Sequence, residues 1–188
     1  ITTIERAEDR TYTVNTSQGS FQAASLVIAS GGLSIPKMCA SPLGYKVAEQ
    51  FGHHIWPTTA GLVPFTLQPD DKEKFEKISG IAVYSIVSNE RIAFKENILF
   101  THRGLSGPAI LQISSYWQPG ETININLLPD IDIEDYLKTQ QSTKPRSTLK
   151  KVLGEFLPKQ LLITFLGQET TEQDLQSLTH SRFNEIAR

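Results

Sequence analysis

IAVYSIVSNERIAFKENILFTH, residues 81–102, decides the fold class of this chain. It contains three stretches with apolar side chains at alternate positions or in short runs, a pattern typical of β-strands. LVPFTL (62–67) and TININLL (122–128) extend the same pattern on either side. Several short strands in succession predict a barrel or a sandwich. We therefore expect a β-barrel-like domain over residues 61–129.

The sequence after this domain changes to a helical period. Leucines and other apolar residues recur there at three- and four-residue spacings, and we expect a small helical cap over residues 130–188. Asp132 and Thr171 are each followed three residues later by an acid, which predicts two helix N-caps. The polar stretch 140–145 is predicted to be an exposed loop.

The sequence before the barrel-like domain divides into two parts. Residues 1–34 predict a hairpin followed by the strand Leu26-Val-Ile-Ala29, whose continuous apolar run is typical of a buried strand in a parallel sheet. Residues 35–60 predict a connecting helix, with Ser41 as its N-cap, Pro42 at its first position and Gly52 beyond its end. The predicted fold class is α+β.

Composition restricts the partners that we expect. The 188 residues carry 18 Lys plus Arg against 20 Asp plus Glu, a formal charge of -2. Nucleic acids and anionic membranes bind proteins that carry a strong positive field. Because the charges of this chain nearly cancel, we expect neither as a partner. No apolar run approaches the roughly 20 residues of a membrane span, and one cysteine, Cys39, excludes an internal disulfide. These features indicate a cytoplasmic protein.

The strand end at residues 26–32 is the first candidate for chemistry. A glycine pair, Gly31 and Gly32, follows the predicted strand, and glycines there let the backbone approach a ligand closely. A tight turn without any ligand explains the same pair equally simply. These residues alone leave both interpretations open.

Two longer motifs carry a family resemblance. ASGGLSIPKMCASPLGYKVAEQFGH (29–53) and LFTHRGLSGPAILQIS (99–114) occur in this order. They resemble the HI0933-like flavoproteins, which have a T-G-G-x-S-x-P strand end, a G-Y-x-x-A-x-x-x-G-H helix and a T-H-x-G-x-S-G-P turn. The chain has Ser30 where the family has threonine, and it departs from the family's glycine- and threonine-rich stretch at residues 38–42.

The resemblance implies an FAD-dependent oxidoreductase, an enzyme as a full-length protein, of which this chain is a central fragment. Residues 1–34 would be the edge of an FAD-binding α/β domain, with the cofactor against Ala29, Ser30, Gly31 and Gly32. The inserted barrel and helical cap would cover the flavin and shape the site for a small-molecule substrate, with NAD(P)H as a second partner. Because the chain contains no G-x-G-x-x-G turn, we expect the isolated chain to bind FAD weakly or not at all and to be inactive.

His102 and Ser106 are the other residues that we considered for a role in chemistry. His102 lies in the Thr-His-Arg-Gly turn, where it either contacts the substrate or makes a local hydrogen bond. No His, Cys, Asp and Glu spacing predicts a metal site. Ser106 lacks the second glycine of a hydrolase nucleophile elbow, because Pro108 takes its place. Two alternative functions stay open, a non-catalytic flavin- or nucleotide-binding protein and a protein-interaction module.

Overall fold

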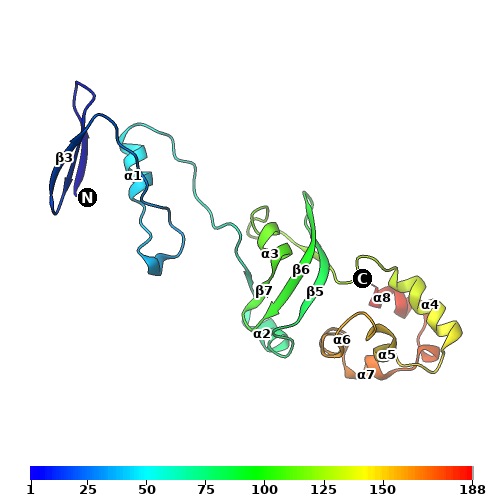
Figure 1. Ribbon diagram of the computed structural model, residues 1–188. Coiled ribbons are helices and arrows are strands. Elements are labelled where there is room, and N and C mark those ends of the chain that lie inside the picture. The colour runs from blue at the N-terminus through cyan, green and yellow to red at the C-terminus, as the bar shows by residue number, and fades with distance from the viewer. Residues whose placement is uncertain (188) are drawn as a thin grey trace. The chain divides into compact units, whose positions relative to one another are not determined.

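The computed structural model describes residues 1–187, apart from the side chains of Pro36 and Asp70 (Figure 1). The chain forms two compact units, Ile1–Thr58 and Thr59–Arg188. Each unit has its own sheet, and the larger unit contains nearly all of the buried apolar side chains.

The first unit begins with a three-stranded antiparallel sheet in the order β1-β2-β3. Its strands are β1 (Thr3–Arg6), β2 (Tyr12–Thr16) and β3 (Gly19–Ala23). A tight turn joins β2 to β3, where Thr16 Oγ1 donates to the Gly19 carbonyl oxygen over 3.0 Å and accepts from the Gln18 amide over 3.1 Å. The predicted hairpin is confirmed.

Helix α1 (Leu43–Gln50) follows a short 3-10 turn, η1 (Pro36–Met38). Its cap residue is Pro42, one position later than predicted, although Ser41 Oγ accepts a hydrogen bond from the Leu43 amide over 3.2 Å. Gly52 has a φ of 79°, which confirms the predicted glycine beyond the helix end. The helix is tied to the sheet by Gln50, whose Nε2 donates to the Ile4 carbonyl oxygen over 2.5 Å.

The strand predicted at residues 26–29 is absent, and that prediction was wrong. Residues 24–34 contain no helix or strand, and Val27 is 84% exposed. A strand that is buried on both faces needs neighbouring strands and covering helices. The described residues supply no partner strand for this stretch, so its apolar side chains stay at the surface.

The second unit contains a five-stranded antiparallel sheet, the barrel-like part of the fold (Figure 1). Its order is β4-β7-β6-β5-β8, and the central strand β6 is a single strand where the sequence suggested two. The strands are β4 (Phe65–Thr66), β5 (Ala82–Ser88), β6 (Ala93–Thr101), β7 (Gly104–Ser106) and β8 (Asn124–Asn126). With the helices below, this sheet confirms the α+β class and the barrel-like insert.

The two faces of this sheet differ in polarity. Along β5, Val83, Ser85 and Val87 are buried, whereas the alternate residue Tyr84 is exposed. Helix α3 (Pro108–Ile113) packs on β5 and β6, with Ala109, Ile110 and Ile113 buried. At the edge of the sheet, Trp117 meets Phe65 edge-on with 5.0 Å between the ring centres, and its Nε1 donates to the Glu121 carbonyl oxygen over 2.7 Å.

The helical part of the second unit shares one apolar core with the sheet. One helix precedes the central strands, and the others follow β8. They are α2 (Pro69–Glu76), α4 (Ile133–Thr143), α5 (Leu149–Leu153), α6 (Lys159–Leu166), α7 (Gln168–Glu172), the 3-10 turn η2 (Leu175–Ser177) and α8 (His180–Ile186). The stretch predicted as a loop at 140–145 begins inside α4, which continues to Thr143.

Only one of the two predicted caps in this part is correct. Asp132 caps α4, where its side chain accepts from the Asp135 amide over 3.0 Å. Thr171 instead lies inside α7, fully buried, and its hydroxyl donates to the Gln168 carbonyl oxygen over 2.9 Å. Thr148 and Thr179 cap the neighbouring helices α5 and α8.

Candidate functional site

The turn between β6 and β7 is organised around the hydroxyl of Thr101. Thr101 Oγ1 donates to the Gly104 carbonyl oxygen over 3.0 Å and accepts from the amides of Arg103 and Gly104 over 3.3 and 3.1 Å. The hydroxyl thus holds the turn together through its hydrogen bonds to the backbone. This local role explains why the motif carries threonine at its first position.

The two glycines of the same motif are required by close backbone approaches. Gly104 has a φ of 149°, and a Cβ atom there would collide with the Phe65 carbonyl oxygen of β4. Gly107 has a φ of 95°, and a Cβ there would lie 2.8 Å from the Asn97 carbonyl oxygen of β6. Both conformations favour glycine. The motif from Thr101 to Pro108 therefore closes the sheet and starts α3.

His102, the predicted substrate residue, lies at the tip of this turn and is exposed. Within the part of the chain that the structure describes, its ring forms no hydrogen bond. The local hydrogen bond that the sequence left open as an alternative is made by Thr101 instead. A contact between His102 and a substrate stays a prediction.

The predicted cofactor residues Ala29, Ser30, Gly31 and Gly32 form an exposed loop in the first unit. The loop lies beside the start of α1: a Cβ atom on Gly44 would lie 3.3 Å from Ser30 Oγ. In the described residues, the backbone amides of the loop form no hydrogen bond, so they are free to bind a ligand or another part of the protein. His102 belongs to the other unit, and the assignment of these four loop residues to a cofactor site stays a prediction.

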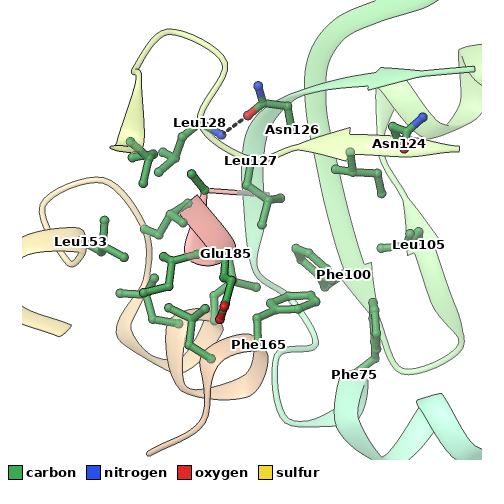
Figure 2. Close-up of a pocket in the computed structure, with 18 residues that line it drawn as sticks. Phe75, Phe100, Leu105, Asn124, Asn126, Leu127, Leu128, Leu153, Phe165 and Glu185 are labelled. Atoms are coloured by element: carbon green, nitrogen blue, oxygen red, sulfur yellow. Dashed lines mark hydrogen bonds between the residues drawn. The ribbon is translucent and has the colours of Figure 1, made fainter. Parts of the chain in front are cut away.

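A large apolar cavity lies between the sheet and the helices of the second unit (Figure 2). Its volume is about 600 Å³. Phe75, Phe100 and Phe165 gather on one side of it, and Leu153 lies across from them (Figure 2). No local pattern in the sequence predicts this cavity, because its lining residues come from separate strands and helices and look like ordinary core positions.

The cavity has few polar groups, and most of these already have partners. Asn126 Oδ1 accepts from the Leu128 amide over 2.9 Å, and Glu185 pairs with Arg182 over 2.6 Å. Glu185 is the one titratable residue that lines the cavity within the described chain. The cavity can exclude water and hold an apolar or flat group, but these residues supply no acid, base or nucleophile for a reaction.

The described residues contain neither a metal-ion cluster nor a membrane-spanning helix. Over residues 1–187, no three His, Cys, Asp or Glu side chains gather in a way that could hold a metal ion. Over the same residues, every helix is too short or too polar to span a membrane.

Comparison with known proteins assigns the class. The family model described as "HI0933-like protein barrel and H2TH domain" matches residues 59–188, which is the second structural unit. The chain therefore belongs to the HI0933-like family, as the two motifs predicted. It matches the barrel and H2TH part of that family, so the five-stranded sheet is the barrel part and the helices after β8 are the H2TH part.

Particular relatives are closely similar in sequence. The chain is 52% identical over 166 residues to the ribosomal RNA dihydrouridine synthase of Escherichia coli (strain K12), covering 86% of the chain and 42% of the relative. It is 38% identical over 173 residues to the enzyme of the same name from Haemophilus influenzae, covering 92% of the chain and 43% of the relative. A 3-dehydro-bile acid delta(4,6)-reductase of Clostridium scindens is 24% identical over 156 residues, 76% of the chain and 37% of the relative. The chain thus spans less than half the length of these enzymes.

These names correct the predicted function. The expectation of an FAD-dependent oxidoreductase with an insert that covers the flavin and shapes a small-molecule site is wrong, because the two most similar of these relatives are named ribosomal RNA dihydrouridine synthases. The motifs had identified the family correctly. They could not identify the substrate, because one motif forms a loop and α1 and the other forms the β6–β7 turn and the start of α3.

The predicted partners are corrected by the same finding. The prediction of a small-molecule substrate and no nucleic acid is wrong, because the two relatives named ribosomal RNA dihydrouridine synthases act on RNA. The prediction was wrong because it was based on the net charge of the whole chain. A formal charge of -2 sums the whole chain, whereas an RNA backbone responds to the local arrangement of lysines and arginines.

Proposed function

We propose that the protein that contains this chain is an enzyme that converts uridine to dihydrouridine in ribosomal RNA. The observation that carries the proposal is the 52% identity over 86% of the chain with a ribosomal RNA dihydrouridine synthase. A second enzyme of this name, at 38% identity over 92% of the chain, supports it. The chain would supply the barrel and H2TH part of the enzyme.

The chemistry of the product defines what the enzyme must provide. Dihydrouridine differs from uridine by a hydrogen atom added to each of C5 and C6, so one carbon receives a hydride and the other a proton. A flavin is a hydride donor in many enzymes. The resemblance to flavoproteins and the reductase among the relatives support FAD as the cofactor of the intact enzyme.

This chain fits a limited part of such a cofactor site. Its loop at Ala29, Ser30, Gly31 and Gly32 is exposed and carries unbonded backbone amides, which suits one wall of a ligand site. The loop offers no enclosed cradle of its own, because a Cβ atom on Gly31 would meet no atom within 4 Å. Most of the binding energy for the cofactor would therefore come from other parts of the enzyme.

The apolar cavity supplies a second, separate contribution. It is lined mainly by leucine, isoleucine and phenylalanine side chains, which exclude water. We propose a structural role for the cavity, as part of the apolar core shared by the sheet and the helices. We also propose a cytoplasmic location, where ribosomal RNA is found.

Nucleoside analysis of ribosomal RNA tests the proposal. Deleting the gene in its host should remove dihydrouridine from ribosomal RNA, and expressing the intact protein from a plasmid should restore it. The dihydrouridine of transfer RNA, measured in the same cells, is the internal control and should not change. If ribosomal dihydrouridine persists in the deletion strain at its original level, the proposed function is wrong.

A further inference from the structure

A stretch of the helical part is rich in cations and free of acids. Residues 136–154 contain five lysines and arginines and neither aspartate nor glutamate, in a chain whose formal charge is -2. Four of the five lie in residues 144–151, which run from the end of α4 into the first residues of α5 and which we call the basic turn. The five are Lys138, Lys144, Arg146, Lys150 and Lys151.

The five cations divide into paired and unpaired groups. Lys138 pairs with Glu134 over 2.7 Å, and Lys150 pairs with Glu172. Lys144, Arg146 and Lys151 are exposed, and in the described part of the chain none of them forms an ion pair. Three positive charges on the basic turn are therefore available to a partner.

The backbone that carries these charges is held in place by hydrogen bonds to a distant segment. The Gln176 amide donates to the Pro145 carbonyl oxygen over 2.9 Å, and the Leu175 amide donates to the Ser147 carbonyl oxygen over 3.0 Å. The Leu149 amide donates to the Gln173 carbonyl oxygen over 3.0 Å. Because the turn is fixed before binding, little conformational entropy of its backbone is lost when a partner binds.

We propose that the basic turn binds the phosphate backbone of the ribosomal RNA substrate. The choice of RNA as partner rests on the proposed function. Unpaired cations release counterions from a polyanion when they bind it. Residues 144–151 include no aromatic side chain on which a base could stack, so the turn holds the backbone and does not read the base sequence.

Helix α2 carries a comparable number of cations in a different arrangement. Lys72 and Lys74 lie in the helix and Lys77 follows it, but Asp71, Glu73 and Glu76 alternate with them. Such mixed charge gives a weak net field. The three lysines of α2 therefore provide a control that removes the same charge from the protein as the three unpaired residues of the basic turn.

The experiment measures binding of the intact protein to deproteinised ribosomal RNA from the deletion strain, over a series of salt concentrations. Three proteins are compared: wild type, the triple variant Lys144→Ala, Arg146→Ala and Lys151→Ala, and the control variant Lys72→Ala, Lys74→Ala and Lys77→Ala. The basic-turn variant should bind at least about tenfold more weakly, with a salt slope flatter by about 2, at about 0.7 per lost phosphate contact on single strands. Circular dichroism should show the same fold for all three proteins.

Each other outcome overturns the inference in a recognisable way. Equal losses in both triple variants would show that net charge matters and position does not. Unchanged binding by the basic-turn variant would exclude the turn from the RNA interface and leave an acidic protein surface as its partner. If wild type itself does not bind ribosomal RNA, both this inference and the substrate assignment fail. If the basic-turn variant binds more weakly as expected but the wild-type protein has no synthase activity, the proposed function fails and the RNA-binding role of the turn stands.

Discussion

The side chain of Gln141 on α4 donates a hydrogen bond to the backbone carbonyl oxygen of Leu175 over 2.7 Å. The same Nε2 group also donates to the Leu178 carbonyl oxygen over 2.9 Å. One amide group thus satisfies two carbonyls of the segment that follows α7, while the leucine side chains of that segment enter the core. Gln141 connects the long helix to the chain segment that supports the basic turn.

Replacing Gln141 by leucine should destabilise the protein. The change keeps the volume but leaves the part-buried Leu178 carbonyl without its donor and removes one of the two donors to the Leu175 carbonyl, at a cost of about 1–3 kcal/mol. Chemical denaturation of the intact protein, followed by circular dichroism, measures the loss. Thr139→Ala, at an exposed position of the same helix, is the matched control and should change stability by no more than about 0.5 kcal/mol. Equal stability of both variants would contradict the proposed role of Gln141.

Replacing Gly104 by alanine should disrupt the pairing of β4 with β7. Alanine would be strained at a φ of 149° by about 1–3 kcal/mol, and its Cβ would also collide with the Phe65 carbonyl oxygen. Gly120→Ala is the control, because φ there is 96° but no atom lies within 4 Å of the added Cβ. We expect a larger fall in the midpoint of thermal unfolding for Gly104→Ala than for the control. Similar midpoints would show that the close approach carries little energy.

Replacing Gly32 by valine in the intact protein should weaken flavin binding by at least about tenfold, or about 1.4 kcal/mol. The left-handed backbone conformation that favours glycine belongs to Gly31, with a φ of 73°, and not to Gly32, so backbone strain is not the reason for this expectation. A Cβ atom at Gly32 would lie 3.5 Å from the Tyr45 hydroxyl oxygen of α1, so the larger valine side chain would displace the loop that we assign to the cofactor. The visible absorption of the purified protein reports bound flavin, and full flavin content in this variant would remove the loop from the cofactor site.

The contact between α4 and α8 should make stability depend on pH. The Lys138 ammonium group and the Asn184 amide, which donates over 2.8 Å, hold the pKa of Glu134 below its usual range. A lowered pKa in the folded state means that this stabilisation is full above the unfolded pKa and is lost as the pH falls through the folded pKa. Thermal midpoints measured from neutral to acidic pH should fall less steeply for Glu134→Gln than for wild type. Parallel curves would contradict this linkage.

The sequence predicted those elements whose signals are local. The helix at Leu43–Gln50 was recognisable because its preceding Ser-Pro and its following Gly52 are read directly from neighbouring residues. The cap at Asp132 was recognisable for the same reason. The predicted boundaries at residues 34, 60 and 129 stay predictions.

The wrong predictions all concerned features that depend on residues distant in the sequence. An apolar run such as Leu26-Val-Ile-Ala29 forms a strand only where other strands pair with it. Thr171 resembled a cap, but the start of its helix is set by Gly167 and by the packing of α7. The sequence did not suggest the RNA partner that we propose, because the net charge averages the cations of the basic turn with acids elsewhere in the chain.

The two tryptophans of the chain give each structural unit an optical signal of its own. Trp56 belongs to the first unit and is 79% exposed, so its fluorescence should already resemble that of an indole in water. Trp117 is part-buried against Phe65 and hydrogen-bonded to Glu121. A red shift of emission on unfolding should therefore come almost entirely from Trp117. With Trp56 replaced by phenylalanine, the remaining emission would follow the opening of the β4 edge of the sheet without interference from the first unit.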